Sequence, residues 1–178
     1  MSAIQTESRK ALNELIDFLR EADDRWAGAE YGRTSEEQVY DAHHALMNML
    51  QGGLVSWYED DPRRPRFQRI VSPTRKFTGD NPDAIYFDCA ISEDLRYVVR
   101  GNMAGAQYVS ITLEAGTQEG HFSTGSCGVI NDTMFDVDAD GNFEIWLGGE
   151  ERARNWLPLP ENTSRITTNR TSSTPSAV

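Results

Sequence analysis

The spacing of apolar residues changes once along this sequence, near Leu54, and that change limits the chain to helices first and strands afterwards. Before Leu54 the apolar residues recur every three or four positions, as on one face of an α-helix. After it they alternate with polar residues. In residues 107–113, for instance, Val109, Ile111 and Leu113 fall on the opposite side from the residues between them. The sequence therefore predicts an α+β fold.

Residues 1–53 are predicted to form a helical hairpin. The first helix has one apolar and one charged face, and Gly28 interrupts it. Ser35 followed by Gln38 supplies a capping box for a second helix. That helix is expected to end at Gly53, because glycine readily takes the left-handed conformation that terminates helices. The hairpin is expected to be antiparallel and to pack on the domain that follows.

Residues 54–166 are predicted to form an antiparallel β-sandwich, jelly-roll-like in outline. Turn residues separate the expected strands, which lie at 67–71, 84–90, 95–100, 106–114, 129–137 and 142–147. The gaps between them are too short for the crossover helix that parallel strands need. Residues 116–128 are expected to form a long surface loop, and residues 167–178, which are rich in Thr and Ser, a disordered tail.

The formal net charge of −11 weighs against nucleic acid as a partner, because Lys and Arg supply most of the affinity for phosphate backbones. Residues 59–76 are the exception, since six basic and three acidic side chains give this run +3 and leave −14 for the rest. The run is interpreted as a solvated loop, with an anion or partner site as the alternative.

Neither membrane insertion nor export is expected. No apolar stretch reaches the roughly 18 residues of a membrane helix, and no signal peptide is visible, so the sequence predicts a cytoplasmic protein. Cys89 and Cys127 are too few and too far apart in sequence for a disulfide framework or a zinc site, and are expected to be reduced thiols. No cofactor is expected.

An acidic run resembles the start of a calcium-binding loop. Asp136, Asp138 and Asp140 occupy alternate positions, but Leu147 stands where such a loop needs a bidentate acid. The preferred interpretation is a β-hairpin turned by Asp-Gly, with a weak cation site at the three aspartates as the alternative.

Few residues offer catalytic chemistry. His121 lies in the same predicted loop as Ser126 and Cys127, and it is the weak candidate for an acid or base. The sequence around Ser126 is not the Gly-x-Ser-x-Gly elbow of a hydrolase nucleophile. Asp41 and His44 have metal-ligand spacing on a helix, but a second such pair is missing.

Aromatic residues on neighbouring predicted strands are the stronger lead. They could line one sheet face as a platform for a sugar or another flat ligand, with ordinary core packing as the alternative; they are Tyr86, Tyr97, Tyr108 and Trp146.

Three segments occur in a characteristic order. An Asn-Pro-Asp turn at 81–83 leads a strand, an Arg-Tyr strand at 95–101 ends in Arg-Gly, and a Tyr-rich strand follows at 107–112. Over roughly residues 57–166, ending near a Trp-Leu-Pro segment, the chain resembles bacterial proteins that carry the domain of unknown function 1214. The resemblance implies a mostly β fold preceded by helices and transfers no catalytic residue. It also implies that this chain corresponds to the first half of such proteins, and that a partner would supply the second half.

The sequence favours a non-catalytic module that binds a small molecule or carbohydrate at the aromatic face. One alternative is a hydrolase or tailoring enzyme acting on a carbohydrate or lipid-like substrate through His121. Another is an interaction subunit, either a homo-oligomer or one part of a larger assembly.

Overall fold

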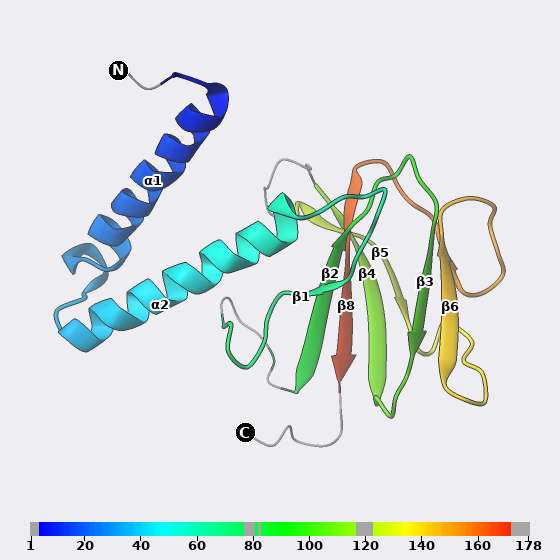
Figure 1. The fold of residues 1–178 in the computed structure, drawn as a ribbon. Coiled ribbons are helices and arrows are strands. Elements are labelled where there is room, and N and C mark those ends of the chain that lie inside the picture. The colour runs from blue at the N-terminus through cyan, green and yellow to red at the C-terminus, as the bar shows by residue number, and fades with distance from the viewer. Residues whose placement is uncertain (1–3, 77–80, 82, 117–122, 172–178) are drawn as a thin grey trace. The chain divides into compact units, whose positions relative to one another are not determined.

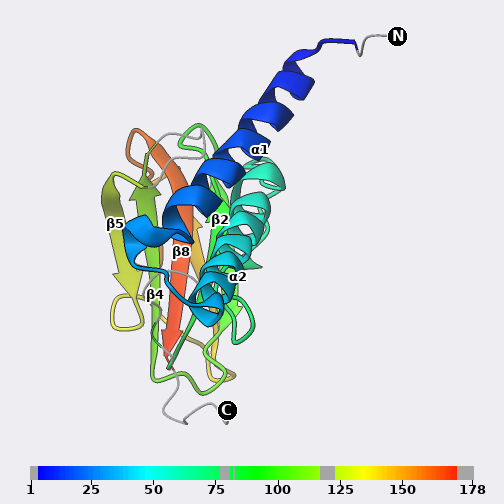
Figure 2. The ribbon, with the colours of Figure 1, turned by 90° about the vertical axis from the view of Figure 1, so that its left-hand side faces the viewer.

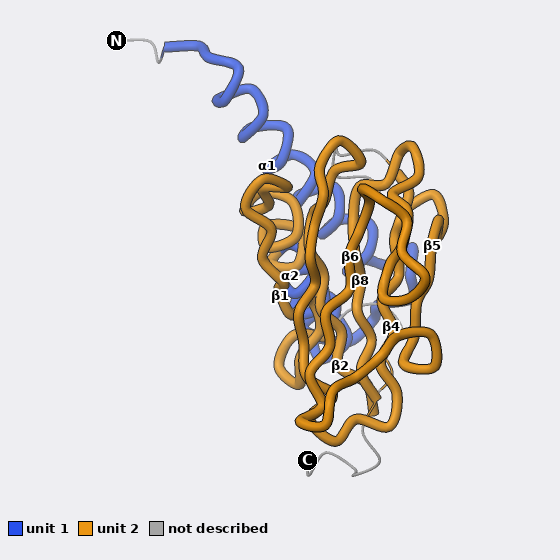
Figure 3. Tube along the Cα trace, turned by 90° about the vertical axis from the view of Figure 1, so that its right-hand side faces the viewer, with its two compact units in different colours: residues 1–50 blue, residues 51–178 orange. Residues whose placement is uncertain are grey.

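The structure is a computed structural model that describes residues 4–76, 81, 83–116 and 123–171. It divides into two compact units, residues 1–50 and residues 51–178, and each is described by itself (Figure 3). The α+β class is confirmed, because helices come first and mostly antiparallel strands follow. Within the described residues, no helix combines the length and the hydropathy of a membrane span. The predicted packing of the helices on the strands stays a prediction.

Both helices begin after side-chain caps, and the cap of the second helix is the one that the sequence predicts. Helix α1 (Glu7–Trp26) begins after Thr6, whose side chain accepts a hydrogen bond from the Arg9 amide. Helix α2 (Glu36–Gly53) begins after Ser35. The Gln38 amide donates to Ser35 Oγ at 3.3 Å, and Gln38 Oε1 accepts from the Ser35 amide at 3.3 Å. The capping box is therefore confirmed.

The helical hairpin differs from the prediction in two respects. The two helices diverge from the short 3-10 turn (Ala29–Tyr31) that joins them instead of packing side by side (Figure 1). Apolar side chains of α1 consequently remain at the surface, with Leu12 56% and Phe18 52% exposed. Helix α2 also does not end at a left-handed glycine, because Gly53 is right-handed and the chain continues through a π-helical turn (Leu54–Tyr58).

The larger sheet of residues 51–178 has five antiparallel strands. Their spatial order, visible in part in Figure 2, is β1 (Gln68–Arg69), β2 (Ala84–Ala90), β8 (Thr163–Thr171), β4 (Tyr108–Ala115) and β5 (Gly125–Asn131). The smaller sheet contains β3 (Tyr97–Asn102), β6 (Asn142–Leu147) and β7 (Trp156–Leu157). In it β3 pairs antiparallel with β6, whereas β6 pairs parallel with β7.

One hydrophobic core contains residues of both sheets. Alternate positions of β4 and β6 supply its most buried members, which are Ile111, Leu113, Ile145 and Leu147, and β8 adds Ile166. The intervening residues lie on the outer faces of the two sheets, as the alternation of a strand requires. Functional groups that can meet solvent therefore lie on these outer faces and in the loops.

The C-terminal prediction is wrong for residues 167–171. These residues belong to β8, which lies between β2 and β4 and is paired on both edges. A strand that lies between two others has its backbone groups hydrogen-bonded on both edges. A Thr-rich sequence with one buried apolar side chain, Ile166, can therefore form a strand here. Residues 172–178 lie outside the described residues.

The strands expected at 67–71, 95–100 and 106–114 differ from the observed ones by one or two residues at their ends, and two boundaries of another strand differ by more. The strand expected at 129–137 ends at Asn131, whose side chain accepts from the Thr133 amide at 3.0 Å and starts a turn. Phe135, inside the expected strand, is a buried loop residue at 3% exposure. Residues 125–128 of the expected loop belong to β5, where Gly128 lies against the Leu113 side chain.

Candidate functional site

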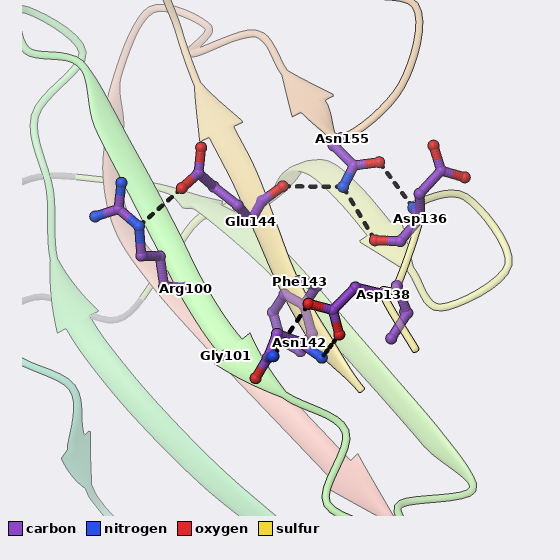
Figure 4. Close-up of a pocket in the computed structure, with 9 residues that line it drawn as sticks. Arg100, Gly101, Asp136, Asp138, Asn142, Phe143, Glu144 and Asn155 are labelled. Atoms are coloured by element: carbon purple, nitrogen blue, oxygen red, sulfur yellow. Dashed lines mark hydrogen bonds and ion pairs between the residues drawn. The ribbon is translucent and has the colours of Figure 1, made fainter. Parts of the chain in front are cut away.

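A cavity of about 610 Å³ opens on the outer face of the smaller sheet (Figure 4). Strands β3 and β6 form its floor and a loop forms its rim; its lining comprises Arg100, Gly101, Asp136, Val137, Asp138, Asn142, Phe143, Glu144 and Asn155. Most of these side chains are polar or charged, so the cavity suits a ligand that forms hydrogen bonds.

Cross-strand pairs order the polar side chains of the floor. Arg100 of β3 lies opposite Glu144 of β6, and Arg100 Nε donates to Glu144 Oε2 at 2.8 Å (Figure 4). One row further, Asn102 Nδ2 donates to Asn142 Oδ1 at 2.7 Å. Side chains held by such pairs keep a fixed orientation toward a ligand.

The floor also depends on a close contact between glycine and an aromatic ring. A Cβ added to Gly101 would lie 2.3 Å from the Phe143 ring, so only glycine leaves room for that ring. The Phe143 ring in turn packs against Phe135, with 4.9 Å between the ring centroids. The cavity floor is thereby tied to the hydrophobic core.

Asn155 joins the rim to the floor. Its side chain accepts from the Asp136 amide at 2.7 Å and donates to the Glu144 carbonyl at 2.9 Å (Figure 4). Asn155 has φ +55, a left-handed conformation that asparagine tolerates better than most residues. Sequence analysis missed this residue, because 19 positions separate it from Asp136 and its only local signal is its residue type.

The acidic run forms a turn, but not the expected hairpin. Asp138 Oδ1 accepts from the amides of Asp140 and Asn142 at 2.9 and 2.8 Å, and Gly141 has φ +84. These hydrogen bonds, foremost those from Asn142, lower the pKa of Asp138. The hairpin prediction is wrong, because β5 and β6 belong to different sheets and do not pair.

The three aspartates of the weak cation site do not converge. Asp136 forms an ion pair with Arg154 at 2.7 Å, and the Asp138 carboxylate is occupied by the turn. Within the described residues, no three His, Cys, Asp or Glu side chains are grouped as metal ligands. The cation site therefore has no geometric support at Asp136, Asp138 and Asp140.

The four predicted aromatic residues do not share one face. Tyr97 packs against the core, and its hydroxyl donates to the Pro62 carbonyl at 3.0 Å. Tyr86 and Tyr108 lie on the outer face of the larger sheet, in adjacent rows across β8. Trp146 lies on the outer face of the smaller sheet, one row from Glu144, with the Arg152 guanidinium 3.8 Å from its ring centroid. The common platform is therefore not formed.

His121 lies outside the described residues, and the other candidates that the structure describes do not line the cavity. Ser126 and Cys127 belong to β5, and Cys127 Sγ contacts Thr163 Oγ1 at 3.4 Å. On α2, the ring of His44 packs near that of Tyr40. The neighbouring His43 forms a hydrogen bond with Asp23, with 2.7 Å between Nε2 and Oδ1.

A buried charge cluster is the second polar feature of this unit, and sequence analysis did not predict it. Arg165 of β8 pairs with Asp60 at 2.7 Å and with Asp88 of β2, and its guanidinium lies 4.9 Å from the Trp57 ring centroid. Burial raises the pKa of Asp88 despite its bonds to Arg165. Burial, together with Asp60 and Asp88, raises the pKa of the Cys89 thiol to about 11. The cluster fixes the loop that begins at Asp60 to the larger sheet.

No protein-family model and no curated protein matches the chain. The crystal structure of an uncharacterised protein from Burkholderia cenocepacia is similar over 94% of this chain, with a TM-score of 0.82 and 21% identity. The VPA0106 protein from Vibrio parahaemolyticus aligns over 99% of the chain, with a TM-score of 0.37 and 14% identity. The chain spans 46% and 43% of the lengths of these two proteins. The first likeness shows that the fold occurs in a longer protein.

Proposed function

We propose that this chain is a non-catalytic binding module that holds a small polar ligand, a carbohydrate in particular, on the outer face of its smaller sheet. The observation that carries the proposal is the 610 Å³ cavity, whose floor presents Arg100, Glu144 and Asn142 in fixed cross-strand pairs. Carbohydrate hydroxyl groups both donate and accept hydrogen bonds. A floor of guanidinium, carboxylate and amide groups matches that chemistry.

A neighbouring aromatic ring favours a sugar over a purely ionic compound as the ligand of this cavity. Trp146 lies one row beyond Glu144 on the same face, and it is partly exposed beneath Arg152. A sugar ring presents an apolar C–H face that packs on indole, while its edge carries the hydroxyl groups. A ligand that spans the cavity and this row would displace Arg152 from the indole. Of the four aromatic residues predicted from the sequence, Trp146 alone is therefore retained in the proposed site.

We also infer that the two sheets form a sandwich, since both contribute to one core. Kinship with the domain of unknown function 1214 remains part of the proposal. The resemblance in strand and turn order is what supports it. The cavity is open on one side, so residues of a partner or of a second half could complete the ligand site.

A glycan array probed with the purified chain tests the proposal, followed by calorimetric titration of each glycan that binds. Glu144→Gln keeps the size of the side chain but removes the carboxylate, so we expect affinity to fall about tenfold, as for loss of a charged hydrogen bond. Glu151→Gln, an exposed acid that does not line the cavity, is the matched control and should leave affinity unchanged.

Two results would contradict the proposal. If no glycan binds, or if Glu144→Gln and Glu151→Gln behave alike, the cavity is not a carbohydrate site. Mass spectrometry of the bound glycan addresses catalysis, because a cleaved or modified product would favour the hydrolase or tailoring-enzyme alternative.

A further inference from the structure

Three exposed arginines lie within four positions of one short loop. Arg63, Arg64 and Arg66 lie between the π-helical turn and β1, in residues 61–67, which we name the arginine loop. No ion pair of these three side chains is found among the described residues. Some other exposed arginines do pair with acids, for example Arg20 with Asp17 and Arg100 with Glu144. The arginine loop therefore concentrates positive charge on one short segment of an acidic chain.

Both aspartates in this segment, Asp60 and Asp61, already have hydrogen-bond or ion-pair partners. Asp60 pairs with Arg165, and both side chains are nearly buried, at 10% and 13% exposure. Asp61 is used by the loop backbone, since its Oδ1 accepts from the Arg63 amide at 2.9 Å and its carbonyl accepts from the Arg64 amide at 2.9 Å. Of the three acids in residues 59–76, only Glu59 remains exposed without such a role.

The backbone of the arginine loop is anchored near both of its ends. The Pro62 carbonyl accepts from the Tyr97 hydroxyl at 3.0 Å. Just beyond the loop, Gln68 pairs with Asp88 as β1 joins the sheet. A backbone fixed in this way presents its side chains without the ordering cost of a mobile loop.

We propose that the arginine loop binds a compact ligand that carries two linked phosphate groups. Guanidinium groups bind phosphate oxygens bidentately, and they remain charged at any physiological pH. Arg63 and Arg66 are three residues apart, so their Cα atoms lie within about 11 Å and their side chains can converge on one diphosphate. This site is separate from the proposed carbohydrate cavity and does not depend on it.

The charge of the rest of the chain favours a compact ligand over a long polyanion. Outside residues 59–76 the chain carries −14. A nucleic-acid strand would extend beyond the loop by more than the Debye length of about 8 Å and meet this negative surface. A diphosphate stays within reach of the three guanidinium groups, so it gains their attraction with less of the surrounding repulsion.

Calorimetric titration of the full chain with inorganic pyrophosphate tests the proposal. We compare wild type with Arg63→Gln/Arg64→Gln/Arg66→Gln and with a control of equal charge change, Arg9→Gln/Arg20→Gln/Arg33→Gln, whose residues are exposed in the helical unit. The loop variant should bind at least about tenfold more weakly, and the control within about twofold of wild type. Circular dichroism should show that all three proteins are equally folded.

A lysine variant separates geometry from charge. Arg63→Lys/Arg64→Lys/Arg66→Lys keeps three positive charges but loses the bidentate fork, so affinity should fall to a value between wild type and the glutamine variant. Any of three results would overturn the proposal: no pyrophosphate binding by wild type at about 50 mM salt, equal loss in the loop and control variants, or tighter binding of a single-stranded DNA than of pyrophosphate.

Discussion

Replacing Arg165 by methionine removes the cation of the buried charge cluster while keeping much of the side chain's length. Asp60 and Asp88 would then be left without their shared guanidinium, at 10% and 5% exposure. Removing one partner of a buried ion pair costs about 3–5 kcal/mol, mainly because the remaining charge stays desolvated. We therefore expect Arg165→Met to lower the free energy of unfolding by about 3–5 kcal/mol and the Tm by roughly 10–20 °C.

Arg154→Met is the matched control for burial. Arg154 pairs with Asp136 at 2.7 Å, the same distance as Arg165 to Asp60, but the two side chains are 50% and 68% exposed. Such surface pairs contribute about 0–1 kcal/mol. Urea unfolding followed by tryptophan fluorescence reports on the right unit, because three of the four tryptophans lie beyond residue 50. Equal losses in the two variants would refute the reasoning.

The pH dependence gives a second readout of the same variant. Burial already raises the folded-state pKa of Asp88, and without the opposing charge of Arg165 that pKa rises further above its unfolded value. A raised folded pKa contributes stability at low pH that is lost as the pH rises through it. The gap between wild type and Arg165→Met should therefore narrow on acidification from about pH 7 toward about pH 5. Adding Asp88→Asn should recover part of the loss at neutral pH.

Three further variants or reactions test local features. Gly101→Val should cost about 1–3 kcal/mol in urea unfolding, because its Cβ meets the Phe143 ring; an unchanged midpoint would contradict this. With its pKa near 11, only about 0.1% of Cys89 is thiolate at about pH 8, so iodoacetamide should label it only after unfolding, as mass spectrometry would show. Tyr97→Phe should cost about 1–3 kcal/mol through two lost hydrogen bonds, whereas Tyr108→Phe should be neutral; similar losses would argue against the difference.

The sequence predicts strands best where a turn signal adjoins an alternating pattern. Strands β2 and β6 have the predicted bounds, and the turn before β6 contains the expected Asp-Gly pair. Strand β8 was missed because its residues are mostly Thr, Ser, Asn and Arg. Its stability comes from β2 and β4, which lie far from it in the sequence. Local propensity cannot report pairing on both edges.

The candidate site was harder to predict, because the expected bounds of a strand do not show which face of the sheet each side chain occupies. Tyr97 and Trp146 lie on neighbouring strands, yet Tyr97 is opposite Leu147 on the core side, and Trp146 is opposite Val98 on the outer side. A difference of one residue in register exchanges the faces. The link from Asn155 to Asp136 and the approach of Asp60 to Arg165 likewise depend on the tertiary fold.

The buried cluster limits which acids of this segment can reach the arginine loop. Asp60 and Asp88 are bound to Arg165 and nearly buried, so they cannot swing outward to screen the guanidinium groups of the loop. The Asp61 carboxylate accepts from the backbone of the loop, which leaves Glu59 as the exposed acid of residues 59–76 without such a role. An anion that approaches Arg63, Arg64 and Arg66 therefore competes with few mobile carboxylates of the same segment.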